Sequence, residues 1–124
     1  MVEFASSARI VLTTTATYDE ANRLGRTLVE EQLAACATLI PAVESIFSWK
    51  GKVETSNETM LMLKTGSEQI AALEARLHNL HSYDTPEFLV LPVEAGSHGY
   101  LEWMLGGLRD LHAPDNPADR PDPK

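Results

Sequence analysis

Residues 33–65, LAACATLIPAVESIFSWKGKVETSNETMLMLKT, constrain the fold more than any other part of this chain. They read as two long strands, each with an apolar core, joined by the turn residues Lys50–Gly51–Lys52, which predicts a long antiparallel hairpin. Successive side chains of a strand point to opposite faces, yet neighbours such as Leu61 and Met62 are both apolar. An antiparallel sheet with one face in water should carry polar residues on that face. We therefore expect a partner subunit to cover the second face.

The pattern on either side of the hairpin indicates an α+β domain. The expected elements are strands at 9–16 and 88–93, helices at 17–34 and 67–81, and a third helix that starts at 97. Thr17 and Glu20 have the spacing of a capping box, and Ser67 is expected to cap the second helix. Pro41 cannot donate to a ladder, so it predicts a bulge within the hairpin. The order is βαββαβ with a C-terminal helix, which is the split βαβ arrangement.

Composition and charge disfavour several classes of protein function. The chain has 124 residues, 44% of them hydrophobic, which suits one globular domain at 1–112 followed by a flexible Pro/Asp-rich tail at 113–124. Its 18 acidic and 10 basic side chains give a net charge of −8, which disfavours nucleic acids and anionic membranes as partners. No apolar run approaches the roughly 20 residues of a membrane span. The N-terminal MVEFASSARI lacks the pattern of a signal peptide, so a cytoplasmic location is expected.

Several blocks of the sequence resemble one known family. LAACATLIP, SIFSWKGK, MLMLKT, HSYDTPEFLVLPV and YLEW are similar to the CutA family of divalent-cation-tolerance proteins and occur in the family's order, from about Ile10 to about Leu108. The resemblance implies a ferredoxin-like βαββαβ sandwich with an extended β-hairpin and a C-terminal helix, assembled into a tight homotrimer. Strand pairing between subunits would also remove exposed strand edges, which otherwise invite aggregation.

Four residues are candidates for a ligand-binding cleft. The family places a tryptophan, a strand-end lysine, a tyrosine and a Pro-Glu pair around an intersubunit cleft, and the resemblance carries these roles to Trp49, Lys64, Tyr83 and Pro86–Glu87. From the residues alone, an ammonium at the end of an apolar strand is costly to bury unless a carboxylate pairs with it, and Glu87 is the expected partner of Lys64. The group is either a small-ligand or ion pocket with Lys64 at its base, or a salt bridge that fixes the trimer.

His81 is the candidate metal ligand. Some CutA proteins carry a thiol in the first strand and a His-His pair at the end of the second helix, and copper ligation has been attached to them; here the equivalent positions hold Thr13 and Leu80–His81. Copper favours thiolate, thioether and imidazole donors. His81 alone therefore predicts only weak binding of Cu²⁺ or another divalent cation, and no obligatory cofactor. The single cysteine, Cys36, lies between alanines and is expected to be a packing thiol.

The expected function is tolerance of, or response to, divalent metal ions such as copper, by a homotrimer that binds a ligand or metal in intersubunit clefts. The sequence has no GxSxG, Walker or HExxH motif, so the protein is not expected to be an enzyme. Two alternatives share the same fold. One is a small-molecule sensor that resembles PII-like trimers, although the chain lacks a basic phosphate-binding loop. The other is a structural trimer that docks an unidentified partner protein.

Overall fold

The computed structural model describes residues 1–111, and the tail expected at 113–124 lies outside the described residues. The elements, in chain order, are β1 (Val2–Phe4), β2 (Ala8–Thr15), α1 (Tyr18–Glu30), β3 (Cys36–Trp49), β4 (Lys52–Gly66), the 3₁₀ turn η1 (Ser67–Gln69), α2 (Ile70–Leu80), β5 (Leu89–Pro92), β6 (Ala95–Ser97) and α3 (His98–Gly106). The α+β class and the long hairpin, formed by β3 and β4, are confirmed. None of the helices in this part of the chain has the length and apolar composition of a membrane span.

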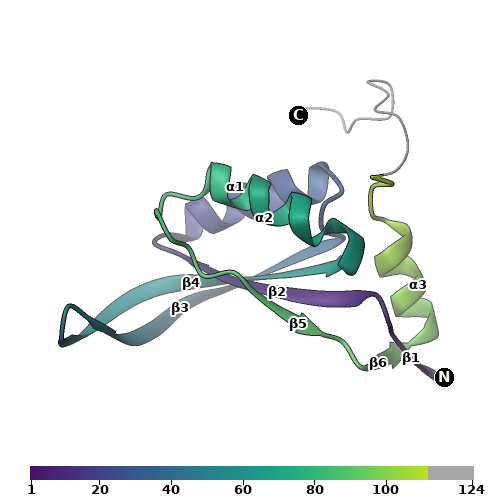
Figure 1. The fold of residues 1–124 in the computed structure, drawn as a ribbon, viewed down its shortest axis with the longest axis horizontal. Helices are drawn as coiled ribbons and strands as arrows, with labels where there is room; N and C mark the ends of the chain where they lie inside the picture. Colours follow the sequence, from purple (N-terminus) through teal and green to yellow (C-terminus); the bar gives the residue numbers. More distant parts are fainter. Residues whose placement is uncertain (112–124) are drawn as a thin grey trace.

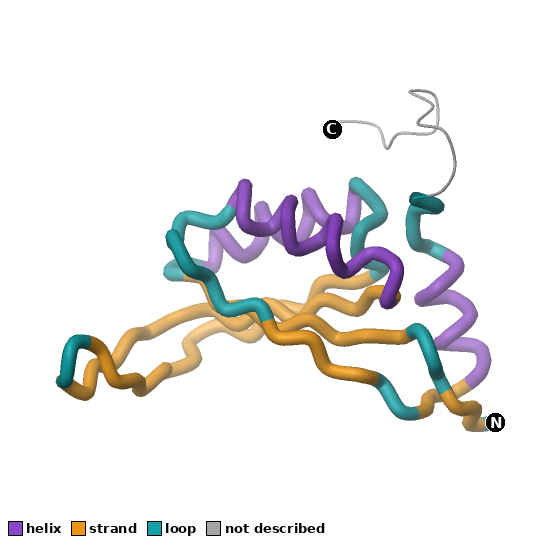
Figure 2. The backbone as a smooth tube through the Cα atoms, in the orientation of Figure 1, coloured by secondary structure: helices purple, strands orange, loops and turns teal. Residues whose placement is uncertain are grey.

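The central sheet has the strand order of a split βαβ domain. It is four-stranded and antiparallel, in the order β3-β4-β2-β5, and α1 and α2 lie together on one of its faces (Figure 1, Figure 2). The main core lies between this helix layer and the sheet, and its buried members are Val11, Leu24, Leu28, Leu33, Ala34, Leu61, Leu63, Leu73 and Leu77. α3 packs at one end of the sheet, where Leu101 and Met104 form a smaller core with Ala8.

The other face of the central sheet has no helix layer over it within residues 1–111 (Figure 1). We call it the open face, and its side chains include Ile10, Leu12, Cys36, Thr38, Ile40, Met60, Met62, Lys64, Leu89 and Leu91. Most of these are apolar, and several are well exposed, such as Leu89 at 53% and Leu91 at 43%. The prediction that both faces of the sheet are apolar is therefore confirmed, and the chain's own helices cover one of them.

The hairpin extends well beyond the body of the domain (Figure 1). β2 pairs with β4 only as far as Thr59, so residues 43–58 form a two-stranded ribbon, which we call the arm. The register shifts between Ile40 and Val43, which confirms the bulge expected at Pro41. The bulge therefore lies at the point where the arm leaves the body.

α1 ends earlier than the range 17–34 expected from its periodicity. Gln32 has a φ of 59°, in the left-handed region. The N–H of Gln32 donates to the Val29 carbonyl at 2.9 Å, and the N–H of Leu33 donates to the Leu28 carbonyl at 3.0 Å. These bonds form a Schellman cap, which usually has glycine at the left-handed position. The helix was predicted too long because glutamine gives no such stop signal.

The expected helix starts are only partly correct. Thr17 Oγ1 accepts the N–H of Glu20 at 3.1 Å, as a capping box requires, but the Glu20 carboxylate binds elsewhere in the fold. The prediction that Ser67 caps the second helix is wrong. Ser67 is the first residue of η1 and its N–H donates to the Ser7 carbonyl at 2.7 Å, while α2 begins at Ile70 without a side-chain cap.

The strands β1 and β6 were not expected from the sequence. They pair antiparallel, with Val2 opposite Ser97 and Phe4 opposite Ala95. His98 fastens β1 to α3, because its Nδ1 lies 2.9 Å from Glu3 and its Nε2 lies 3.0 Å from Glu102. The hydrogen bond to Glu3 raises the pKa of His98. Such short strands carry too little alternation to be recognised before their partner is known.

Candidate functional site

The candidate cleft residues lie in separate places on a single chain. Trp49 is exposed at the end of the hairpin, opposite Lys52, whereas Lys64 lies near the other end of β4. The stretch from Lys52 to Lys64 spans about 40 Å at about 3.3 Å per residue. Glu87 is exposed in the loop before β5. Trp49 and Lys64 can therefore share a cleft only when two copies of the chain come together.

Lys64 takes Tyr100 as its partner, and the expected pair with Glu87 is not formed within residues 1–111. Lys64 Nζ donates to the Tyr100 hydroxyl at 2.9 Å and lies 5.1 Å from the centre of the Tyr100 ring. This hydrogen bond raises the pKa of Lys64, so its side chain stays cationic. Lys64 pairs with a β2 residue that lies near one end of the β2–β5 ladder. Glu87 lies beyond the opposite end of the same ladder. α3 brings Tyr100 to Lys64 instead.

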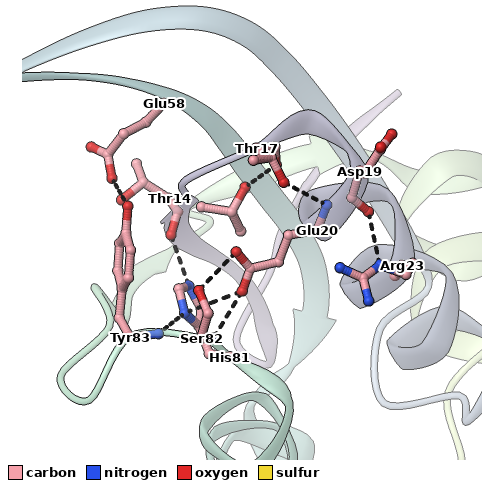
Figure 3. A network of polar contacts seen from close by, with 10 residues as sticks. Thr14, Thr17, Asp19, Glu20, Arg23, Glu58, His81, Ser82 and Tyr83 are labelled. Carbon is pink, nitrogen blue, oxygen red and sulfur yellow. Dashed lines mark hydrogen bonds and ion pairs between the residues drawn. The ribbon is translucent and has the colours of Figure 1, made fainter.

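His81 is buried, and both of its ring nitrogens are engaged (Figure 3). Its Nδ1 accepts the N–H of Tyr83 at 3.0 Å. The neutral ring therefore carries its proton on Nε2, which donates to the Thr14 carbonyl at 2.8 Å. Glu20 Oε2 lies 3.7 Å from Nδ1. A metal ion bound at Nδ1 would have to replace the hydrogen bond from Tyr83.

Glu20 ties the same loop to α1 (Figure 3). Its Oε2 accepts the N–H of Ser82 at 2.8 Å, and its Oε1 accepts the Ser82 hydroxyl at 2.9 Å. The Glu20 side chain is only 10% exposed, so these charge-assisted bonds are little weakened by water. The sequence analysis did not select Glu20 as a site residue. Its four-residue spacing to Leu24, on the buried stripe of α1, was the signal that could have found it.

Tyr83 reaches from this loop to the base of the arm (Figure 3). Its hydroxyl donates to Glu58 Oε2 at 2.8 Å, and its ring centre lies 4.8 Å from that of His81. Burial and the Glu58 carboxylate raise the pKa of Tyr83 to about 12, so the hydroxyl remains a donor at neutral pH. We call Glu20, His81, Ser82 and Tyr83 the loop clamp. Nothing in the sequence pattern pointed to Glu58 as a partner.

The donor set of one chain suits hydrogen bonding and ion pairing better than tight metal binding. In residues 1–111, no group of three or more His, Cys, Asp and Glu side chains is placed to hold a metal ion. Thr13, where some relatives are expected to carry a thiol, is fully buried, and its Oγ1 has no hydrogen-bond partner among residues 1–111. Cys36 lies opposite Lys64 on the open face, and its Sγ is 3.8 Å from Thr38 Oγ1. A metal site with three such ligands would need a second copy or residues beyond 111.

Comparison with known proteins matches this chain to a single family. Residues 9–106 match the family described as CutA1 divalent ion tolerance protein. The divalent-cation tolerance protein CutA of Pectobacterium atrosepticum is 44% identical over 89 residues, which are 72% of this chain and 81% of that protein. The chloroplastic protein CutA of Arabidopsis thaliana is 35% identical over 101 residues, which are 82% of this chain but only 56% of that longer protein.

The fold is also similar to solved structures. The structure of CutA from Synechococcus elongatus PCC7942 complexed with a Bis-Tris molecule has a TM-score of 0.81 to this chain at 34% identity, covering 87% of this chain and 100% of that one. The family match begins in β2 and ends with α3, so it includes the central sheet, both helices of the layer and the arm. The chain therefore belongs to the CutA1 divalent ion tolerance protein family.

Proposed function

We propose that this chain is a divalent-cation tolerance protein that acts as a homotrimer and binds small ligands or metal ions in the clefts between its subunits. The proposed role is non-catalytic, in keeping with relatives that are named for tolerance rather than for a reaction. In this proposal the protein works in the cytoplasm. Copper or another divalent cation is a weakly bound effector whose presence is signalled through the trimer.

The observation that carries this proposal is the apolar open face. Leu89 and Leu91 are exposed there, and the arm carries exposed apolar side chains of its own, including Ile46 and Val53. Burial of apolar surface contributes roughly 25 cal/mol for each Å² removed from water. Copies of the chain that cover each other's open faces would gain this free energy, and paired arms would also satisfy exposed strand edges.

Assembly would also complete the candidate cleft. The arm of one copy could bring Trp49 to the body of another, which a single chain cannot do because of the length of β4. Lys64, held cationic beside Tyr100, would then face an anionic group of a ligand or the Glu87 carboxylate of a neighbouring copy. The S. elongatus relative, whose structure is described as complexed with a Bis-Tris molecule, supports the proposal that this chain binds small molecules.

Copper is expected to bind with micromolar or weaker affinity, and His81→Ala is expected to reduce that affinity further. Binding at His81 Nδ1 would displace the N–H of Tyr83, and this lost hydrogen bond makes the site weak. The carboxylate of Glu20, whose Oε2 lies 3.7 Å from Nδ1, would be available as an oxygen ligand. Isothermal titration calorimetry with Cu²⁺ measures the affinity of both proteins.

His78→Ala is the matched control, because His78 is exposed on α2 three residues before His81. It should leave the copper affinity unchanged. Circular dichroism should first show that His81→Ala keeps its helix content, since the side chain is buried. Sub-nanomolar binding that His81→Ala does not alter would contradict the assignment of His81.

A small-molecule sensor is the second candidate, and the cationic Lys64 beside Tyr100 favours it. In that case a nucleotide or a di- or tricarboxylate should raise the melting temperature of the protein, and Lys64→Ala should abolish the increase. A thermal-shift screen of metal ions, nucleotides and carboxylates separates the candidates. A screen without any stabilising compound would favour the third possibility, a trimer that serves only as a docking structure.

A further inference from the structure

The arm is attached to the body by a weakened connection. Within the described residues 1–111, its strands pair only with each other beyond Thr59, over about 20–25 Å at about 3.3 Å per residue. An isolated two-stranded ribbon is marginally stable in water. At its base, β3 is interrupted by the bulge, where Pro41 has no N–H to donate and Ala42 has a φ of 59°. This junction could bend if nothing else held it.

The hydrogen bond between Tyr83 and Glu58 crosses this junction. Glu58 pairs with Val43, so it is the first residue of the arm beyond the bulge on the β4 side. Its carboxylate accepts the Tyr83 hydroxyl at 2.8 Å. The two residues are 25 positions apart in the sequence, so the contact joins separate parts of the fold. Because the acceptor is ionised, the bond is stronger than one between neutral groups.

The Tyr83 side of this bond is fixed to the body. The Tyr83 N–H is held by His81, His81 is held by the Thr14 carbonyl of β2, and Ser82 is held by Glu20 of α1 (Figure 3). These anchors come from a strand and a helix of the main body. The loop clamp can therefore hold the phenol at a defined place relative to the central sheet.

We propose that the Tyr83–Glu58 hydrogen bond is a clasp that sets the angle of the arm relative to the body, so that a single chain already holds the arm in the orientation that a second copy captures. This proposal rests on the proposed self-association, because the hydrogen bond prepares the arm for contact with a second copy. The loop clamp then has a positioning role. It fixes the loop that carries Tyr83, and the bond from Tyr83 to Glu58 fixes the arm. Fixing an arm before binding lowers the conformational entropy lost on association.

The proposal is tested by Tyr83→Phe, which removes the hydroxyl and keeps the ring that packs on His81. Hydrogen–deuterium exchange of peptides from the arm, residues 43–58, should become about five-fold faster, as expected for the loss of one hydrogen bond. After dilution from denaturant, assembly followed by light scattering should slow by a similar factor. Exchange in α2 and β2 should stay unchanged. Tyr18→Phe is the matched control, because Tyr18 is exposed at the start of α1 and lies outside the clasp.

A double-mutant cycle separates the clasp from a general loss of stability. Glu58→Ala should reproduce the effect of Tyr83→Phe, and the two changes together should do no more than either alone. Glu58→Gln, which keeps an acceptor oxygen, should restore part of the protection. Additive effects in the double variant, or unchanged exchange in the arm, would overturn the clasp. A wild-type chain that stays monomeric would refute the self-association, whereas the exchange measurement would still decide whether the clasp holds the arm.

Discussion

Met62→Glu is expected to convert the assembled protein into single folded chains. Met62 lies on the open face, between Thr38 of β3 and Leu12 of β2 in the register of the sheet. In one chain its side chain is only partly buried, so a carboxylate at this position can reach water. Between subunits the same carboxylate would lose its contact with water, at a cost of several kcal/mol. Sedimentation velocity at micromolar concentration measures the resulting mass.

Ala71→Glu is the control for this substitution. Ala71 is exposed on α2, in the helix layer on the other side of the sheet, and glutamate is a good helix former. The mass of the Ala71→Glu variant in solution should equal that of the unaltered protein. Circular dichroism should show that Met62→Glu keeps its helices. An assembly of unchanged mass in Met62→Glu, or a monomeric wild-type chain, would refute the proposal that the open face is covered by other copies.

Glu20→Ala is expected to lower the free energy of unfolding by about 2–3 kcal/mol, the range for losing hydrogen bonds to a buried charged group. The substitution removes the acceptor for both the N–H and the hydroxyl of Ser82. It also removes the carboxylate beside His81 Nδ1. The loop at 81–88 should then exchange its amide hydrogens faster. Urea unfolding at a fixed protein concentration gives the free energy, and exchange of the loop peptide locates the change.

Asp19→Ala is the matched control for Glu20→Ala. Asp19 is an exposed acidic residue in the same first turn of α1, so its loss removes the same charge from the helix N-terminus. The interaction of an acidic side chain with the helix N-terminus stabilises the helix by about 0.3–1 kcal/mol at an exposed site. Glu20→Gln, which keeps one acceptor oxygen, should fall between the two. Equal destabilisation by Asp19→Ala and Glu20→Ala would show that the charge at the helix end, and not the loop clamp, accounts for the effect.

The regular elements of the fold were largely predictable from sequence, and the errors occur where a distant segment decides the outcome. The hairpin and α2 show clear periodicity, and Pro41 marks the bulge through its missing donor. The end of α1 depends on the left-handed Gln32, which is unusual for that residue type. β1 exists because β6 pairs with it, and the two strands are separated by almost the whole domain.

The sequence indicated that some polar side chains need a partner, but not which partner each of them has in the fold. Lys64 was identified as an ammonium in need of a partner, yet its partner is Tyr100, 36 residues away in α3. The Glu20 carboxylate was assigned to a capping box, yet it binds Ser82, 62 residues away. A local rule can identify a polar group that needs a partner. It cannot identify that partner, because the packing of helices and strands decides which groups lie close together.

The sequence by itself determined that the central sheet is apolar on both faces, because the alternation of side chains is a property of the strand backbone and is repeated at every residue. The tertiary structure alone decided which polar groups meet. A hydrogen bond requires its donor and acceptor to lie about 3 Å apart. For Tyr83 and Glu58 that distance is fixed only after α1, β2 and the hairpin have packed together and set the path of the loop.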